Sequence, residues 1–171
     1  KLFISFLGIK NIKIFNNAVL DEIKSVEFIE QDQKGNKLYG SSYVNVEIKK
    51  NKNSQNINGT SLDAFYNSQI DDSNINISFI KIDIEGLELL ALKGAKKIIE
   101  KYQPLMIIEV NANNRSGKLF EFLFNSNYFA YTVKFHQKKG IVELVQINGK
   151  NFNETTDVLF IPKNKIYKSY A

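Results

Sequence analysis

The chain has no cysteine, only two prolines and only one histidine among 171 residues. Without cysteine, a disulfide framework, a thiolate metal site and a cysteine nucleophile are all excluded. No apolar run approaches the length of a membrane span, and the first residues do not have the pattern of a signal peptide. We therefore expect a cytoplasmic protein with no membrane span.

The basic residues are almost all lysine. They number 23 with arginine included, against 18 acidic residues, which gives a net charge of +5. Recognition of phosphates and base edges gains most from the planar guanidinium of arginine. The lysines are also dispersed in pairs such as Lys49-Lys50 and Lys138-Lys139, without one stripe interleaved with aromatic residues. This distribution argues against a nucleic-acid partner.

Length and composition predict a single globular domain spanning residues 1–171. Hydrophobic residues make up 43% of the chain and aromatic residues 12%, which is enough to form one sizeable core. Apolar residues at helical spacing before Gly8 indicate the end of an amphipathic helix. Because the chain does not start with Met, we expect it to begin partway through its gene.

The N-terminal third reads as short strands followed by a helix. Residues 12–15 are apolar except for Lys13 and predict a strand. Residues 25–29 and 43–48 alternate apolar with polar residues, which predicts a hairpin or short meander. Residues 51–59 are polar and read as a loop. A short helix carrying Leu62, Phe65 and Tyr66 is expected next, ending near Ile70.

The centre of the chain has the pattern of a strand, a helix and a second strand. Residues 79–84 and 105–110 are apolar runs that predict buried strands. Between them, Leu87, Leu90 and Ala91 mark the inner face of a helix of four or five turns that begins at Gly86. Strands joined by one short helical crossover are parallel. The fold class is therefore α/β.

The C-terminal part predicts one more helix and three strands in succession. The helix covers residues 117–124, and the strands cover 128–135, 141–147 and 157–161. Consecutive strands with short turns pair antiparallel. We expect a mostly parallel sheet with antiparallel strands at one edge.

Carboxylates follow the two central strands, where ligands bind in open parallel sheets. Asp83 and Glu85 lie at or just past the end of the first strand, and Glu109 has a comparable position on the second. A carboxylate ending an apolar strand costs desolvation unless it is paired, hydrated or used. Glu88 is better explained as an acid at a helix start. His136 lies beside a predicted turn and reads as a surface residue.

The pattern from residue 77 to residue 109 resembles the central signature of the FkbM-type methyltransferases. The match consists of the strand with Asp83, the acid-glycine pair Glu85-Gly86, the run Lys93-Gly94-Ala95, and Pro104 followed by a strand that ends in Glu109. Similar upstream and downstream segments extend the resemblance to nearly the whole chain. They include Asn11-Ile12, Asn17-Ala18-Val19, Leu62-Asp63-Ala64-Phe65 and Asp157-Val158-Leu159-Phe160-Ile161-Pro162.

The resemblance implies a class I, Rossmann-like methyltransferase fold and S-adenosylmethionine as cofactor. It places Asn17 and Ala18 near the adenine, and Asp83 near the methionine part of the cofactor and the acceptor. Glu85 and Glu109 would line the acceptor side, with Asp83, Glu85 and Glu109 as the catalytic set. The first strand with its glycine-rich turn, and the second with its ribose-binding acid, are expected to precede Lys1, so the fold would be N-terminally incomplete.

The implied activity is O-methylation of a small-molecule or glycan acceptor, often a sugar or glycoconjugate. Two alternatives remain open. One is a non-catalytic, truncated α/β domain that binds a partner through an exposed strand edge. The other is a metal-assisted methyltransferase in which Asp83, Glu85 and Glu109 are oxygen ligands. We favour a site without metal, and the sequence leaves the acceptor and the oligomeric state open.

Overall fold

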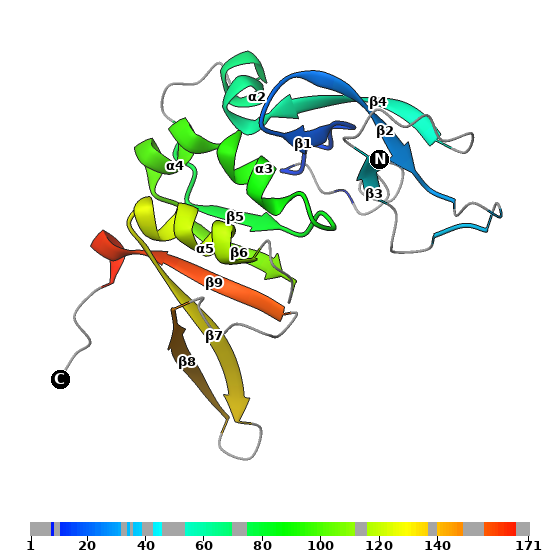
Figure 1. Ribbon diagram of the computed structural model, residues 1–171. Helices are drawn as coiled ribbons and strands as arrows, with labels where there is room; N and C mark the ends of the chain where they lie inside the picture. The colour runs from blue at the N-terminus through cyan, green and yellow to red at the C-terminus, as the bar shows by residue number, and fades with distance from the viewer. Residues whose placement is uncertain are drawn as a thin grey trace.

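The computed structural model describes ten segments, which are residues 8, 11–31, 34, 36–38, 43–45, 54–69, 75–111, 116–136, 140–148 and 156–166. The helix predicted before Gly8 lies outside these segments. Within them the chain forms two β-sheets with helices packed between and against them, which confirms the α/β class (Figure 1).

Among the described residues, the first sheet has the strand order β1-β4-β2-β3. The bounds are Ala18–Leu20 for β1, Lys24–Ile29 for β2, Tyr43–Asn45 for β3 and Ser54–Ser61 for β4. β1 runs parallel to β4, while β2 pairs antiparallel with both β3 and β4. The predicted hairpin is confirmed, because β2 and β3 pair and a further bridge joins Gln31 to Lys37.

Two predictions for this region are wrong. Residues 12–17 form no strand; Phe15 instead stacks edge-on against Phe65, with 4.7 Å between ring centroids. Residues 54–59 of the segment predicted as a polar loop belong to β4, one of the two inner strands of this sheet. Pairing on both sides overrides its poor strand propensity. Gly59 is needed there, since a Cβ atom would lie 2.4 Å from Leu20 Cδ1 and 2.8 Å from the Lys24 carbonyl oxygen.

The second described sheet has the order β5-β6-β9-β7-β8. The bounds are Phe79–Ile82 for β5, Leu105–Val110 for β6, Tyr128–His136 for β7, Ile141–Ile147 for β8 and Thr156–Pro162 for β9. β5 and β6 are parallel, as predicted, and the other three pairings are antiparallel. The prediction of a mostly parallel sheet is therefore wrong, because β9 inserts antiparallel between β6 and β7 and the first sheet is also mixed, with one parallel and two antiparallel pairings.

Four helices are described, with α2 at Leu62–Gln69, α3 at Glu88–Lys93, α4 at Lys96–Tyr102 and α5 at Ser116–Asn125, and a short 3-10 turn, η1, follows β9 at Lys163–Lys165. The single helix expected after Gly86 is divided into α3 and α4. Its break at Gly94 frees backbone N–H groups at the start of α4. The Asp63 carboxylate accepts hydrogen bonds from two of them, Lys97 N at 2.9 Å and Ile98 N at 3.0 Å. In the described segments no helix has the length and apolar character needed to cross a bilayer.

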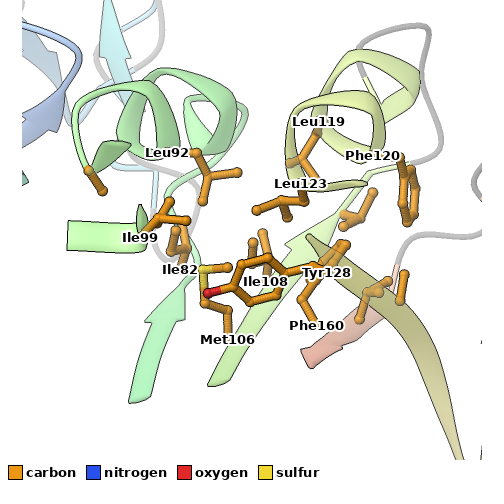
Figure 2. Packing of buried hydrophobic residues seen from close by; sticks show 14 residues of the cluster. Ile82, Leu92, Ile99, Met106, Ile108, Leu119, Phe120, Leu123, Tyr128 and Phe160 are labelled. Carbon is orange, nitrogen blue, oxygen red and sulfur yellow. The ribbon is translucent and has the colours of Figure 1, made fainter. Parts of the chain in front are cut away.

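The main core lies between the second sheet and the helices (Figure 2). Ile82, Met106, Ile108 and Phe160 point from the strands towards Leu92 and Ile99 on one side and Leu119, Phe120 and Leu123 on the other. The large ring of Tyr128 is fully buried, and its hydroxyl donates to the Pro104 carbonyl oxygen at 2.9 Å. Burial raises the pKa of the Tyr128 hydroxyl, so this group stays neutral and serves as a donor.

Helix α3 connects the two sheets. Its buried Leu92 belongs to the main core, whereas Leu87, just before the helix, packs into a smaller cluster with Ala18, Leu20 and Val26 of the first sheet. Ile84 contacts both clusters. The first sheet is thus held beside the carboxyl end of β5, where the predicted site residues lie.

Candidate functional site

The loop after β5 carries two of the predicted carboxylates. The strand ends at Ile82 and α3 begins at Glu88, so Asp83 and Glu85 occupy the connection, as predicted. Glu85 has φ 54° and Gly86 has φ 93°. A left-handed conformation is routine for glycine and unfavourable for glutamate, and strain of this kind is concentrated at functional sites.

A cavity of about 640 Å³ opens between this loop and the first sheet. The loop contributes Asp83 and Glu85, and the chain entering β1 contributes Asn17 and Ala18. Four residues singled out from the sequence, from segments more than 60 positions apart, therefore line one cavity. Ligand sites usually have volumes of about 300 to 1,000 Å³, so the cavity is large enough for a small molecule.

Glu109 does not line this cavity. It lies on β6 next to the end of β5, since the parallel register pairs Ile82 with Ile108. On its other side Glu109 pairs with Asp157 of β9. The parallel pairing of β5 and β6 brings Glu109 and Asp83 to one rim of the sheet, at the carboxyl ends of these two strands. Glu109 nevertheless lies outside the described cavity wall.

Lys81 links the carboxylates of this rim. Its ammonium donates to Asp157 Oδ1 at 2.5 Å and lies 3.5 Å from Asp83 Oδ2. The hydrogen bond with Asp157 is the main cause that raises the pKa of Lys81, and the negative charge of Asp83 adds to it. Lys81 therefore remains a cation that fixes the orientation of both carboxylates. All three side chains are substantially exposed, so these pairs contribute little to stability.

Glu109 is the carboxylate with a raised pKa at this rim. Partial burial is the largest cause, and the negative charges of Asp83, Glu85 and Asp157 raise the pKa further, with Lys81 acting in the opposite direction. Like charges on neighbouring strands thus disfavour the ionised form of Glu109.

We expect Glu109→Gln to stabilise the protein at pH 7. The folded state holds the Glu109 proton more tightly than the unfolded chain, so its contribution to stability falls as the pH rises from the ordinary pKa of 4.5 through the raised value. The gain in unfolding free energy should disappear below that ordinary pKa. Urea denaturation at a series of pH values measures this gain. The control is Glu121→Gln, which removes the same negative charge from an exposed position on α5. A gain independent of pH would contradict the prediction.

Most of the opposite cavity wall was missed by sequence reasoning. It is formed by the first sheet. The lining residues are Phe28 on β2, Glu30 directly after β2, Tyr43 and Val44 on β3, and Gln55 and Ile57 on β4. No local motif marks these positions. The sequence predicts a loop where β4 begins, so the β4 residues that line the cavity give no local signal.

Glu88 and His136, the two other residues considered from the sequence, lie outside the cavity wall. Glu88 begins α3 and is buried, with its Oε1 accepting from the Gly86 N–H at 2.8 Å. His136 is on the surface, as predicted, and its Nε2 lies 2.7 Å from Glu143 Oε2 on the paired strand β8. Within the described part of the chain, no three His, Asp or Glu side chains are grouped so as to hold a metal ion.

Comparison with known proteins identifies the family. No curated protein and no solved structure matches the chain. The family model described as the methyltransferase FkbM domain does match, over residues 8–150, a span that includes the cavity residues and both strands of the rim. The chain therefore belongs to the FkbM methyltransferase family.

Proposed function

We propose that the protein is an S-adenosylmethionine-dependent O-methyltransferase acting on a hydroxyl of a small molecule or glycan, with a sugar or glycoconjugate as the first class to test. The observation that carries the proposal is the single cavity lined by Asn17, Ala18, Asp83 and Glu85. These are the positions at which the family resemblance places the cofactor and the acceptor. Family membership supports methyl transfer as the reaction class.

The described cavity lining suits a positively charged ligand. It contains three carboxylates, Glu30, Asp83 and Glu85, and no lysine, arginine or histidine among its described residues. Carboxylates nearby favour a bound cation. The apolar side chains Leu87 and Ile57 provide contact area for a ring system. Asn17 and Ala18 would hold the adenine end, and Asp83 would face the charged end.

When bound, S-adenosylmethionine supplies a methyl group attached to a positively charged sulfur. The protein then has to align the acceptor oxygen with that methyl group and exclude water. Asp83 would orient the acceptor hydroxyl and accept its proton. Glu85 would bind a second hydroxyl of the acceptor. Glu109, outside the cavity wall, would contact those parts of an acceptor that extend along the rim.

Asn17→Ala should weaken binding of S-adenosylmethionine about tenfold, the loss expected from one hydrogen-bonding side chain in a ligand site. Asn17 is exposed and precedes β1, so the substitution should not alter the fold. Isothermal titration calorimetry of the cofactor into both proteins measures the change. Asn11→Ala is the control, because Asn11 is also exposed and does not line the cavity. Equal affinities for wild type and Asn17→Ala would remove Asn17 from the site.

The proposal as a whole is tested by transfer of a labelled methyl group. Protein and labelled S-adenosylmethionine are incubated with a panel of neutral sugars, amino sugars and glycosides, and the products are analysed by mass spectrometry.

We also propose that residues 1–171 form one domain, which is supported by the packing of Ile84 in both clusters. We further propose that the protein is cytoplasmic, which agrees with its lack of cysteine.

A second candidate function is a non-catalytic interaction module. It is favoured by the β7–β8 hairpin, which extends away from the helices (Figure 1) and exposes five large apolar side chains, Val133, Phe135, Ile141, Val142 and Leu144. Exposed apolar patches of this kind mark interaction sites. Calorimetry separates the two candidates, since a non-catalytic module should take up no S-adenosylmethionine.

A further inference from the structure

The connection between β5 and α3 contains a backbone conformation that needs support. Glu85 and Gly86 both have positive φ values, 54° and 93°. A glutamate with φ in this range persists only when surrounding contacts enforce it. Because Glu85 lines the cavity, the contact that enforces this turn also decides where the Glu85 carboxylate points.

Glu88 makes that contact. The residue is only 7% exposed, and its Oε1 accepts the Gly86 N–H at 2.8 Å. A buried carboxylate is costly unless it is hydrogen-bonded, and bonds from backbone N–H groups to a carboxylate are among the strong ones. The bond spans only two residues and closes a small ring around the turn.

Glu88 is separated from the cavity itself. The residues that line the cavity from this segment are Asp83, Ile84, Glu85 and Leu87, whereas Glu88 begins α3 and lies on its buried side. Any effect of Glu88 on a ligand in the cavity must therefore pass through the turn.

We propose that Glu88 is a positioning residue that fixes the Glu85–Gly86 turn and thereby aims the Glu85 carboxylate into the cavity. The inference rests on the proposed function and adds to it a second carboxylate with a separate task. Glu85 contacts the acceptor, and Glu88 holds the backbone from which Glu85 projects. The second acid of the Glu-Gly-Leu-Glu sequence thus has a role beyond its favourable place at a helix start.

Two substitutions separate this role from simple packing. Glu88→Gln keeps an acceptor oxygen at the same chain length, while Glu88→Met keeps the length and removes the acceptor. We expect Glu88→Met to lower kcat/KM for the acceptor about 10²-fold, the cost of a misplacement of about 1 Å. Glu88→Gln should remain within about threefold of wild type, since its carbonyl can still accept the Gly86 N–H. Affinity for S-adenosylmethionine should change much less than the KM for the acceptor.

A second readout does not depend on activity. Protection of the Gly86 amide against hydrogen exchange, measured by NMR, should be high in wild type and Glu88→Gln and lost in Glu88→Met. Glu100→Met is the matched control, because Glu100 is 61% exposed on α4 and pairs only loosely with Lys96 at 3.9 Å. It should leave both turnover and Gly86 protection unchanged.

The outcomes are distinct. An inactive wild type would mean that the proposed function fails. An active wild type with Glu88→Met equally active, or with Gly86 still protected in that variant, would overturn the positioning role. If Glu88→Met does not fold, Glu88→Gln decides, because loss of turnover with an intact Gly86 hydrogen bond would contradict the inference.

Discussion

Asp83→Asn is expected to reduce methyl transfer by about 10²- to 10⁴-fold, the range over which a positioned acid or base contributes to a reaction. The asparagine has the same shape but cannot take a proton from the acceptor hydroxyl. Asp83 lines the cavity at the end of β5. The rate should fall through kcat more than through KM, because the proton is transferred only as the new bond forms.

The same substitution should leave folding nearly unchanged. The Asp83 side chain is 52% exposed, and its ion pair with Lys81 is long, at 3.5 Å. Loss of an exposed pair changes the free energy of unfolding by less than about 1 kcal/mol. Urea denaturation of the variant should therefore overlay that of the wild type.

Asp157→Asn provides the matched control. Asp157 also binds Lys81 and is similarly exposed, at 59%, but it does not line the cavity. A large loss of turnover in Asp83→Asn with little loss in Asp157→Asn would support a catalytic role for Asp83. Equal turnover in wild type and Asp83→Asn would remove Asp83 from the mechanism, and equal losses in both variants would assign the effect to Lys81.

Gly94→Ala is expected to destabilise the protein by about 3 kcal/mol or more, since it forces a methyl group into closely packed backbone. A Cβ atom at this position would lie 2.0 Å from the Leu20 carbonyl oxygen and 3.0 Å from the Ser61 Cβ. Gly94 also accepts the Asp63 N–H at 2.8 Å. Because the obstacle is backbone, rotation of a side chain cannot relieve it.

The effect of Gly94→Ala should extend to ligand binding. Gly94 is where α3 touches the end of β1, and the beginning of β1 carries Ala18, one wall of the cavity. Displacing β1 should weaken binding of S-adenosylmethionine in whatever fraction of the variant still folds. Urea denaturation and calorimetry measure the two effects. Gly117→Ala is the control, because a Cβ atom there meets nothing within 4 Å and alanine is the better helix former by up to about 1 kcal/mol. A stable Gly94→Ala would contradict the close approach of the two segments.

Several parts of the fold followed directly from local pattern. The apolar runs that became β6 and β7 were identified, as was the parallel pairing of β5 with β6 across a helical crossover. Apolar periodicity is a local property, and it predicts well where one face of an element is buried. β5 fits less well, because it is an edge strand of the described sheet and leaves Phe79 51% exposed.

The errors occurred where distant segments decide the conformation. Residues 54–61 are mostly polar and contain Gly59, yet they form an inner strand of the first sheet because β1 and β2 pair with them from both sides. The single helix expected after Gly86 is interrupted at Gly94, where β1 approaches. Neither partner lies close in the sequence, so no local window contains the reason.

By itself the sequence determined the α/β class, the family and the rim at which Asp83, Glu85 and Glu109 gather, because strand ends and the residues that follow them are read locally. Only the tertiary structure decided that β2, β3 and β4 form the other wall of the cavity that Asn17, Ala18, Asp83 and Glu85 line, and that Glu109 stays outside it. The physical reason is that the cavity forms where the first sheet packs beside the β5 loop, through Leu87 and Ile84 on one side and Leu20 and Val26 on the other. That contact depends on shape complementarity between segments far apart in the chain.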